Sequence, residues 1–106
     1  MNVSQLRTFV AVVDHGSFSE AARVLGISQP AVTMQIQALE ADIASTLLDR
    51  GYRKVSLTEA GYALLPHART VLAELDDARH AIDAVSTTVS GRLMLAASTT
   101  PGQYLL

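Results

Sequence analysis

The feature that most constrains the fold of this chain is a pair of short helical patterns joined by a tight turn within residues 17–36. Ser17 is suited to cap the first helix, and Glu20, three residues later, completes a capping-box pattern. Gly26 is suited to end that helix, because glycine readily adopts a left-handed backbone. Ser28 is suited to cap the second helix. Two capped helices separated by so short a turn predict a helix-turn-helix.

The details of this segment support the same prediction. Ala21, Ala22 and Leu25 form the apolar stripe of the first helix, and the small alanines allow the second helix to cross closely. Ile27 is expected to be a buried plug in the turn. Pro30 fits the first turn of the second helix, where its missing N–H is not needed. In a helix-turn-helix, the second helix enters the major groove of DNA.

This second helix has one apolar face and one polar face. Residues spaced by four, three and four positions form the face expected to pack on the core: Val32, Ile36, Leu39 and Ile43. The opposite face and the N-terminus carry the residues expected to meet DNA: Gln29, Pro30, Thr33, Met34 and Gln37. Glutamine pairs with adenine, threonine contacts base edges or the thymine methyl, and a helix N-terminus favours phosphate. The alternative is that this face is simply solvated.

Composition indicates one small folded domain. The chain has 106 residues, of which 49% are hydrophobic, and it contains no cysteine. The lack of cysteine excludes a disulfide framework and any cysteine-based zinc or redox site. No apolar run is long enough to span a membrane, and the N-terminus is unlike a signal peptide. We therefore expect a cytoplasmic protein that has no membrane partner.

The net charge of −2 argues against DNA binding, because nucleic-acid-binding domains are usually basic. The distribution of charge weakens that objection. Residues 1–57 hold five basic and five acidic residues, and the excess acid lies in residues 58–106. We infer weak non-specific binding by each subunit and a reliance on several subunits acting together.

A first helix is expected from Ser4, as its cap, to about His15, where Gly16 ends it. Its core stripe is predicted to be Leu6, Phe9, Val10 and Val13. Residues 47–57 place a Gly-Tyr tip between two short apolar ends, which is typical of a β-hairpin. After a helix-turn-helix such a hairpin is a wing, and its cations would touch phosphates or the minor groove: Arg50, Arg53 and Lys54. The alternative is a solvated basic turn.

A long helix is predicted to start at Thr58 and to end near residue 86, with Pro66 close to its beginning. Apolar residues recur along it at alternating steps of four and three: Leu64, Ala68, Val71, Leu75, Ala78, Ile82 and Val85. This is a heptad seam. A helix of this length measures roughly 40 Å, which is more than a small winged domain covers. The seam is expected to pack on the same helix of a second copy, although the helix could instead fold back on its own domain.

The end of the chain has a different character. Residues 87–91 show no helical signal and are expected to form a hinge, whereas residues 92–98 are predicted to form a buried strand. A lone strand is not stable by itself. The predicted class is mainly α, a winged helix-turn-helix followed by a long linker helix. The predicted divisions are a DNA-binding domain, a dimerisation helix, a hinge and the start of an α/β effector-binding domain: residues 1–57, 58–86, 87–91 and 92–106.

Taken in order, the motifs resemble the LysR-type transcriptional regulators of bacteria. They cover nearly all of residues 4–61 at that family's spacing: Leu6 and Phe9, residues 16–18, Ala21, Ala22 and Leu25, residues 28–33, Ile36, Leu39 and Glu40, Arg50, and residues 57–61. The resemblance implies sequence-specific binding to an inverted-repeat operator by a homodimer or homotetramer. It also implies that a small-molecule coinducer binds the effector domain of the full-length protein.

The resemblance also assigns roles by position. Residues expected near the bases are Gln29, Pro30, Thr33 and Met34. Residues expected on the DNA backbone or in the groove beside the wing are Ser28, Arg50, Arg53 and Lys54. Residues expected to begin the effector pocket are Ser98, Thr99 and Thr100.

Two other classes of function are weighed against this one. The first is a protein-interaction module that has lost DNA binding and works through its coiled coil, which the neutral charge and Met34 favour. The second is an enzyme. His67 and His80 are thirteen residues apart on one predicted helix, so they cannot converge, and no phosphate loop or nucleophile constellation is present. We therefore predict no catalytic residues, no metal site and no cofactor.

Overall fold

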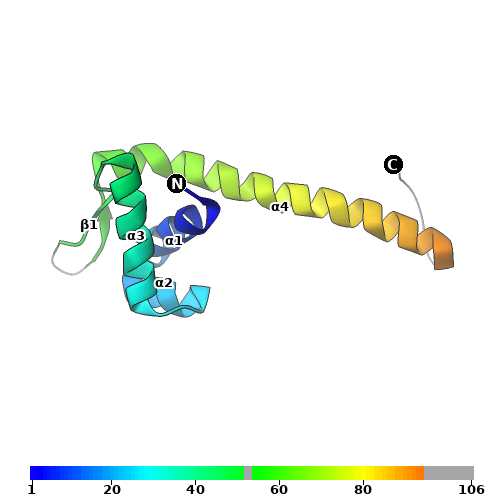
Figure 1. Ribbon diagram of the computed structural model, residues 1–106, viewed down its shortest axis with the longest axis horizontal. Coiled ribbons are helices and arrows are strands. Elements are labelled where there is room, and N and C mark those ends of the chain that lie inside the picture. Colours follow the sequence, from blue (N-terminus) through cyan, green and yellow to red (C-terminus); the bar gives the residue numbers. More distant parts are fainter. Residues whose placement is uncertain (52–53, 95–106) are drawn as a thin grey trace. The chain divides into compact units, whose positions relative to one another are not determined.

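In the computed structural model of the chain, the backbone is described for residues 1–51 and 54–94, and the side chains as far as residue 86. The elements in order are α1 (Val3–His15), α2 (Phe18–Leu25), α3 (Gln29–Ile43), β1 (Leu48–Asp49), β2 (Ser56–Leu57) and α4 (Glu59–Met94) (Figure 1). They fall into two units, residues 1–72 and 73–106. The prediction of a mainly helical chain with a small two-stranded wing and a long last helix is confirmed.

The core of the first unit lies between α1, α2, α3 and the first half of the wing. Its buried apolar residues are Leu6, Phe9, Val12, Phe18, Ala21, Ala22, Val32, Ile36, Leu39, Leu47, Leu48 and Ala68. In α1 the fully buried valine is Val12, whereas the predicted Val10 and Val13 are half-buried. Leu6, Phe9 and Val12 are three residues apart, so Val10 and Val13 lie at the margins of that stripe.

The helix caps agree with the predictions for α2 and α3 but not for α1. Asn2, rather than Ser4, caps α1: its side chain accepts a hydrogen bond from Gln5 N at 2.8 Å, and Asn2 N donates to Gln5 Oε1 at 3.1 Å. This reciprocal pair satisfies two donors at once, and Ser4 already lies inside the helix. Ser17 and Ser28 cap α2 and α3 as predicted, accepting from the backbone N–H three residues later.

Only half of the predicted capping box at Ser17 forms. The carboxylate of Glu20 accepts hydrogen bonds from Arg23, at 3.1 Å from Nε and 2.9 Å from Nη2. It does not return to the backbone of Ser17, because the guanidinium one turn away is a charged donor and forms the stronger interaction. This guanidinium also lowers the pKa of the Glu20 carboxyl.

The turn between α2 and α3 is stabilised by its backbone. Gly26 has a φ of +73°, the left-handed value predicted for it. Both Gly26 N and Ile27 N donate to Ala22 O, at 2.9 and 3.1 Å. Ile27 is 38% exposed, so the prediction of a buried plug is wrong, and Leu25 is only half-buried. The backbone hydrogen bonds close the turn without burying the isoleucine.

The start of α4 belongs to the core of the first unit. Thr58 Oγ1 accepts from Gly61 N at 3.1 Å, which confirms the predicted start of this helix. Ala68 is fully buried and Leu64 is half-buried against the core. Ala68 is therefore wrongly assigned to a dimer seam, because its own domain already covers it. Beyond this point Val71, Leu75, Ala78, Ile82 and Val85 are exposed; we call these five residues the outer seam.

α4 also continues further than predicted. It runs through residues 87–91 to Met94, so the expected absence of helix at the hinge and the expected strand at residues 92–94 are wrong. Serine, threonine and glycine lower helix propensity by only about 1 kcal/mol or less each, and extending a helix is far easier than starting one. The rest of the predicted strand, with Ser98, Thr99 and Thr100, lies outside the described residues. None of the helices described is long and apolar enough to cross a membrane.

Candidate nucleic-acid interface

The sequence predicted the two faces of α3 correctly. Val32, Ile36 and Leu39 are buried, and Ile43 is half-buried. On the other side Gln29, Pro30, Met34 and Gln37 are exposed, and Thr33 is half-buried. Met34 is 68% exposed, which is unusual for a large apolar side chain. The face therefore presents amide, hydroxyl and thioether groups, with no acidic residue between positions 29 and 39.

The N-terminus of α3 is tied to α2 by side chains. Ser19 Oγ donates a hydrogen bond to Gln29 Oε1 at 3.1 Å. The amide oxygen of Gln29 is thus occupied, while its NH2 group remains a donor. Ser28 Oγ accepts from Ala31 N at 3.2 Å, which leaves the hydroxyl hydrogen available to an external acceptor.

The wing predicted at residues 47–57 is present. Its strands are antiparallel, with Leu48 opposite Leu57 and Asp49 opposite Ser56. Gly51 N donates to Asp49 Oδ1 at 3.1 Å, which turns the chain after the first strand. Of the wing cations, Arg50 and Lys54 are exposed, and Arg53 lies outside the described residues.

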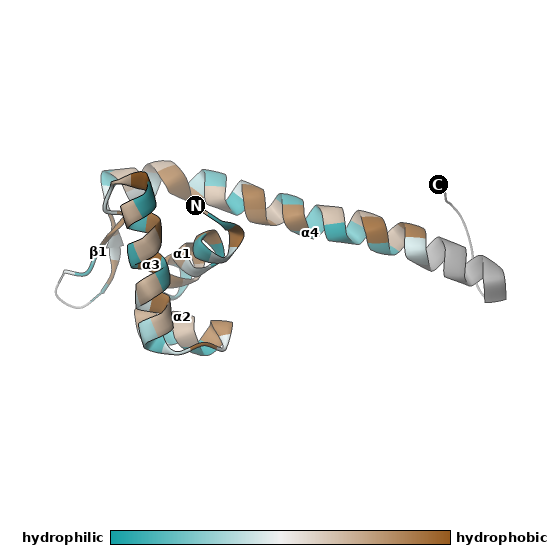
Figure 2. Ribbon diagram, viewed as in Figure 1, coloured by the Kyte–Doolittle hydropathy of each residue, from teal (hydrophilic) through white to brown (hydrophobic). Residues whose placement is uncertain are grey.

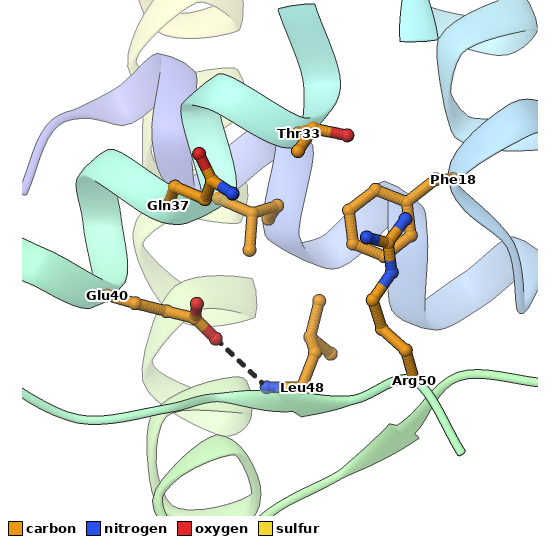
Figure 3. Close-up of a pocket in the computed structure, with 7 residues that line it drawn as sticks. Phe18, Thr33, Gln37, Glu40, Leu48 and Arg50 are labelled. Carbon is orange, nitrogen blue, oxygen red and sulfur yellow. Dashed lines mark hydrogen bonds between the residues drawn. The ribbon is translucent and has the colours of Figure 1, made fainter. Parts of the chain in front are cut away.

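Arg50 makes a contact that the sequence did not reveal. Its guanidinium lies over the ring of Phe18 at the start of α2, with Cζ 3.9 Å from the ring centroid (Figure 3). In the part of the chain that the structure describes, no carboxylate pairs with it. An arginine stacked on an aromatic face is held in place while its N–H edges stay available. The Gly16-Ser17-Phe18 motif was read only for its cap, and nothing in the spacing indicated this contact.

Two hollows lie beside Arg50. One, of about 90 Å³, opens between α2, α3 and β1 (Figure 3), and its lining is Phe18, Thr33, Ile36, Gln37, Glu40, Leu48 and Arg50. The other, of about 170 Å³, opens between α2 and the wing, and its lining is Gly16, Ser17, Phe18, Ser19, Gln29, Arg50, Lys54 and Val55. The second hollow combines two cations with hydroxyl and amide donors. In the described residues no cluster of metal-ligating side chains is present.

Glu40 joins α3 to the wing. Its Oε2 accepts hydrogen bonds from the backbone N–H groups of Leu47 at 2.7 Å and of Leu48 at 3.3 Å (Figure 3 draws the bond to Leu48). Residues 47 and 48 are both buried. Sequence analysis noted Glu40 only as part of a motif, because its acceptor role depends on where the chain returns after α3.

The comparisons with known proteins agree with this geometry. Residues 3–62 match the family described as bacterial regulatory helix-turn-helix proteins of the lysR family. The chain belongs to the LysR family. It is thus a DNA-binding transcriptional regulator, and the proteins it resembles are regulators rather than enzymes.

Similar LysR-type proteins include an uncharacterized HTH-type transcriptional regulator in the ibpB-leuC intergenic region of Azotobacter vinelandii. It is 49% identical over 98 residues, a match that covers 92% of this chain and 68% of the relative. A probable RuBisCO transcriptional regulator of Cyanidioschyzon merolae is 43% identical over 104 residues, covering 98% of this chain and 34% of the relative. The chain thus spans about a third of the second protein.

A solved structure also matches the fold. The DNA-binding domain of BenM in complex with catB site 1 DNA superposes with a TM-score of 0.78 and 37% sequence identity. The match covers 82% of this chain and 98% of that one.

Proposed function

We propose that this LysR-type chain binds an inverted-repeat operator as a homodimer, with α3 in the major groove and the wing on the adjacent backbone and minor groove. One observation carries the proposal. The exposed face of α3, which has no acidic side chain, is joined to the wing cations by the two hollows around Arg50. A surface of donors bordered by cations is complementary to a DNA groove and its phosphates.

The base-reading residues are proposed to be Gln29, Thr33, Met34 and Gln37, with Pro30 packing close to them. Because Ser19 occupies the amide oxygen of Gln29, that side chain acts through its NH2 group, which donates to a base acceptor or a phosphate. Gln37 is exposed and has both groups available. Met34 offers an apolar contact to a thymine methyl.

The backbone-binding residues are proposed to be Ser28, Arg50, Arg53 and Lys54. The hollow between α2 and the wing brings Arg50 and Lys54 together with Ser17 and Ser19. A phosphate oxygen seated there would meet two positive charges and hydroxyl donors beside the N-terminus of α2. The stacking of Arg50 on Phe18 reduces the entropy lost when this contact forms.

The dimer is proposed to form through the outer seam, which is exposed along α4. Leu64 and Ala68 are excluded from it because they pack on their own domain. In the full-length protein we further propose a cytoplasmic homotetramer that responds to a small-molecule coinducer, with Ser98, Thr99 and Thr100 at the start of the effector pocket. These proposals rest on the family to which the chain belongs.

The test is fluorescence anisotropy of this chain on a duplex carrying an interrupted inverted repeat, beside a scrambled duplex, across a salt series. We expect preference for the repeat and an affinity that falls steeply with salt, because cations that neutralise phosphates release counterions. A folded, dimeric chain that binds neither duplex at low salt would favour the interaction-module alternative.

A further inference from the structure

The wing contains little that could hold it in place by itself. Each of its strands has two residues, and the pairing consists of Leu48 with Leu57 and Asp49 with Ser56. A two-stranded hairpin of this size is marginal in water. Its position relative to α3 must therefore come from contacts at its base, which we define as residues 46–48.

The base of the wing is anchored on both sides of its backbone. The N–H groups of Leu47 and Leu48 both donate to Glu40 Oε2. The carbonyl of Leu47 accepts from Thr58 N at 3.0 Å, and Thr58 Oγ1 donates to the carbonyl of Thr46. Gly61 presses on the same place: a Cβ added there would lie 2.3 Å from Leu47 O.

Glu40 differs from the other anchors because it comes from the helix proposed to read the bases. It lies three residues after Gln37, on the same side of α3, and both residues line the hollow that Arg50 closes. Its carboxylate accepts two N–H groups from residues that are buried, where water cannot replace it. Arg50 follows Leu48 by two positions, so the placement of the base sets the placement of the first wing cation.

We propose that Glu40 is a positioning residue that fixes the wing on the recognition helix, so that the wing cations meet the phosphates in register with the bases read by α3. This inference rests on the proposed function. It assigns Glu40 no contact with DNA: the carboxylate acts through the backbone of Leu47 and Leu48.

The experiment uses Glu40→Ala, Glu40→Asp and Glu40→Gln in the same chain, with anisotropy on both duplexes across a salt series. Alanine removes the acceptor, and aspartate keeps the charge but shortens the side chain by one methylene. Both should bind the two duplexes about tenfold less tightly near physiological salt, and the slope of log affinity against log salt should fall by about 1. Glutamine is the matched control, because it loses the charge but keeps an acceptor oxygen. It should retain the slope of the unsubstituted chain.

Amide hydrogen exchange of Leu47 and Leu48 in the free protein provides a second readout. Both amides should be protected in the unsubstituted chain and in Glu40→Gln, and should exchange faster in the other two variants. Circular dichroism establishes which variants are folded. If Glu40→Ala does not fold, Glu40→Asp decides.

Three results would overturn the inference: an unchanged salt slope in a folded Glu40→Ala or Glu40→Asp, an equal loss in Glu40→Gln, or unprotected amides in the unsubstituted chain. If the unsubstituted chain binds no DNA, the proposed function fails instead, and the amide exchange still tests the tether.

Discussion

Helix α3 and the part of α4 within residues 73–86 both carry apolar residues at helical spacing, but the structure treats them differently. In α3 that face is covered by α1 and α2, and Val32 and Leu39 are fully buried. Every side chain of residues 73–86 is exposed, including Leu75, Ile82 and Val85 (Figure 2 shows the apolar residues recurring along the helix). Periodicity therefore identifies a face that needs covering but not which chain covers it.

The largest expected effect contrasts one residue from each helix. Leu39→Ala removes a fully buried side chain from the core and should lower the free energy of unfolding by about 2–5 kcal/mol. Ile82→Ala, which alters a side chain that is 65% exposed, should change it by less than about 0.5 kcal/mol. The measurement is urea unfolding at a protein concentration where the chain is monomeric. Equal effects would mean that residues 73–86 fold back on their own domain.

The next effect tests the outer seam itself. Leu75→Glu places a charge in the proposed dimer interface, so the chain should become monomeric in sedimentation experiments. Binding to the inverted repeat should weaken by about a hundredfold, because the second half-site loses its linked partner. The control is Ala73→Glu, which adds the same charge to an exposed position outside the seam. A Leu75→Glu dimer that persists at micromolar concentration would refute the coiled-coil assignment.

A smaller effect separates base reading from assembly. Thr33→Ala should lower the preference for the repeat over the scrambled duplex by about tenfold, as expected for one lost base contact. The salt slope should not change, because no phosphate contact is lost. The same loss per half-site should occur in the Leu75→Glu background, since Thr33 acts within one subunit. An unchanged preference would remove Thr33 from the reading face.

The smallest effect concerns the ion pair between α1 and the beginning of α4. Arg69 donates to Asp14 from Nη2 at 2.7 Å and from Nη1 at 3.2 Å. This hydrogen-bonded guanidinium lowers the pKa of the Asp14 carboxyl, whose burial opposes the change only in part. Both side chains are nearly half exposed, so the pair contributes little.

Asp14→Asn should therefore lower the melting temperature only slightly at neutral pH. Because the folded pKa is depressed, the stabilisation is present above the ordinary carboxyl pKa and is lost as pH falls through the folded pKa. The difference between the two proteins should disappear in acid. A difference that grows below about pH 4 would contradict this explanation.

The sequence predicted best where a local rule had one solution. Gly16 and Gly26 both adopt the left-handed backbone expected after a helix, and Ser17 and Ser28 cap the helices that follow them. It failed where two local solutions competed. Asn2 displaced Ser4 as the cap of α1, and a helix already formed ran on through residues 87–91.

The sequence by itself determined the helix-turn-helix, the wing and the two faces of α3, because caps, turn glycines and apolar spacing depend on residues close together in the chain. Tertiary structure alone decided the roles of Glu40, Phe18 and Ala68. Glu40 reaches the amides of residues 47 and 48, Phe18 lies under the guanidinium of Arg50, and Ala68 packs on the core of its own domain. These contacts join residues distant in sequence, and their energies exist only once the chain has folded back on itself.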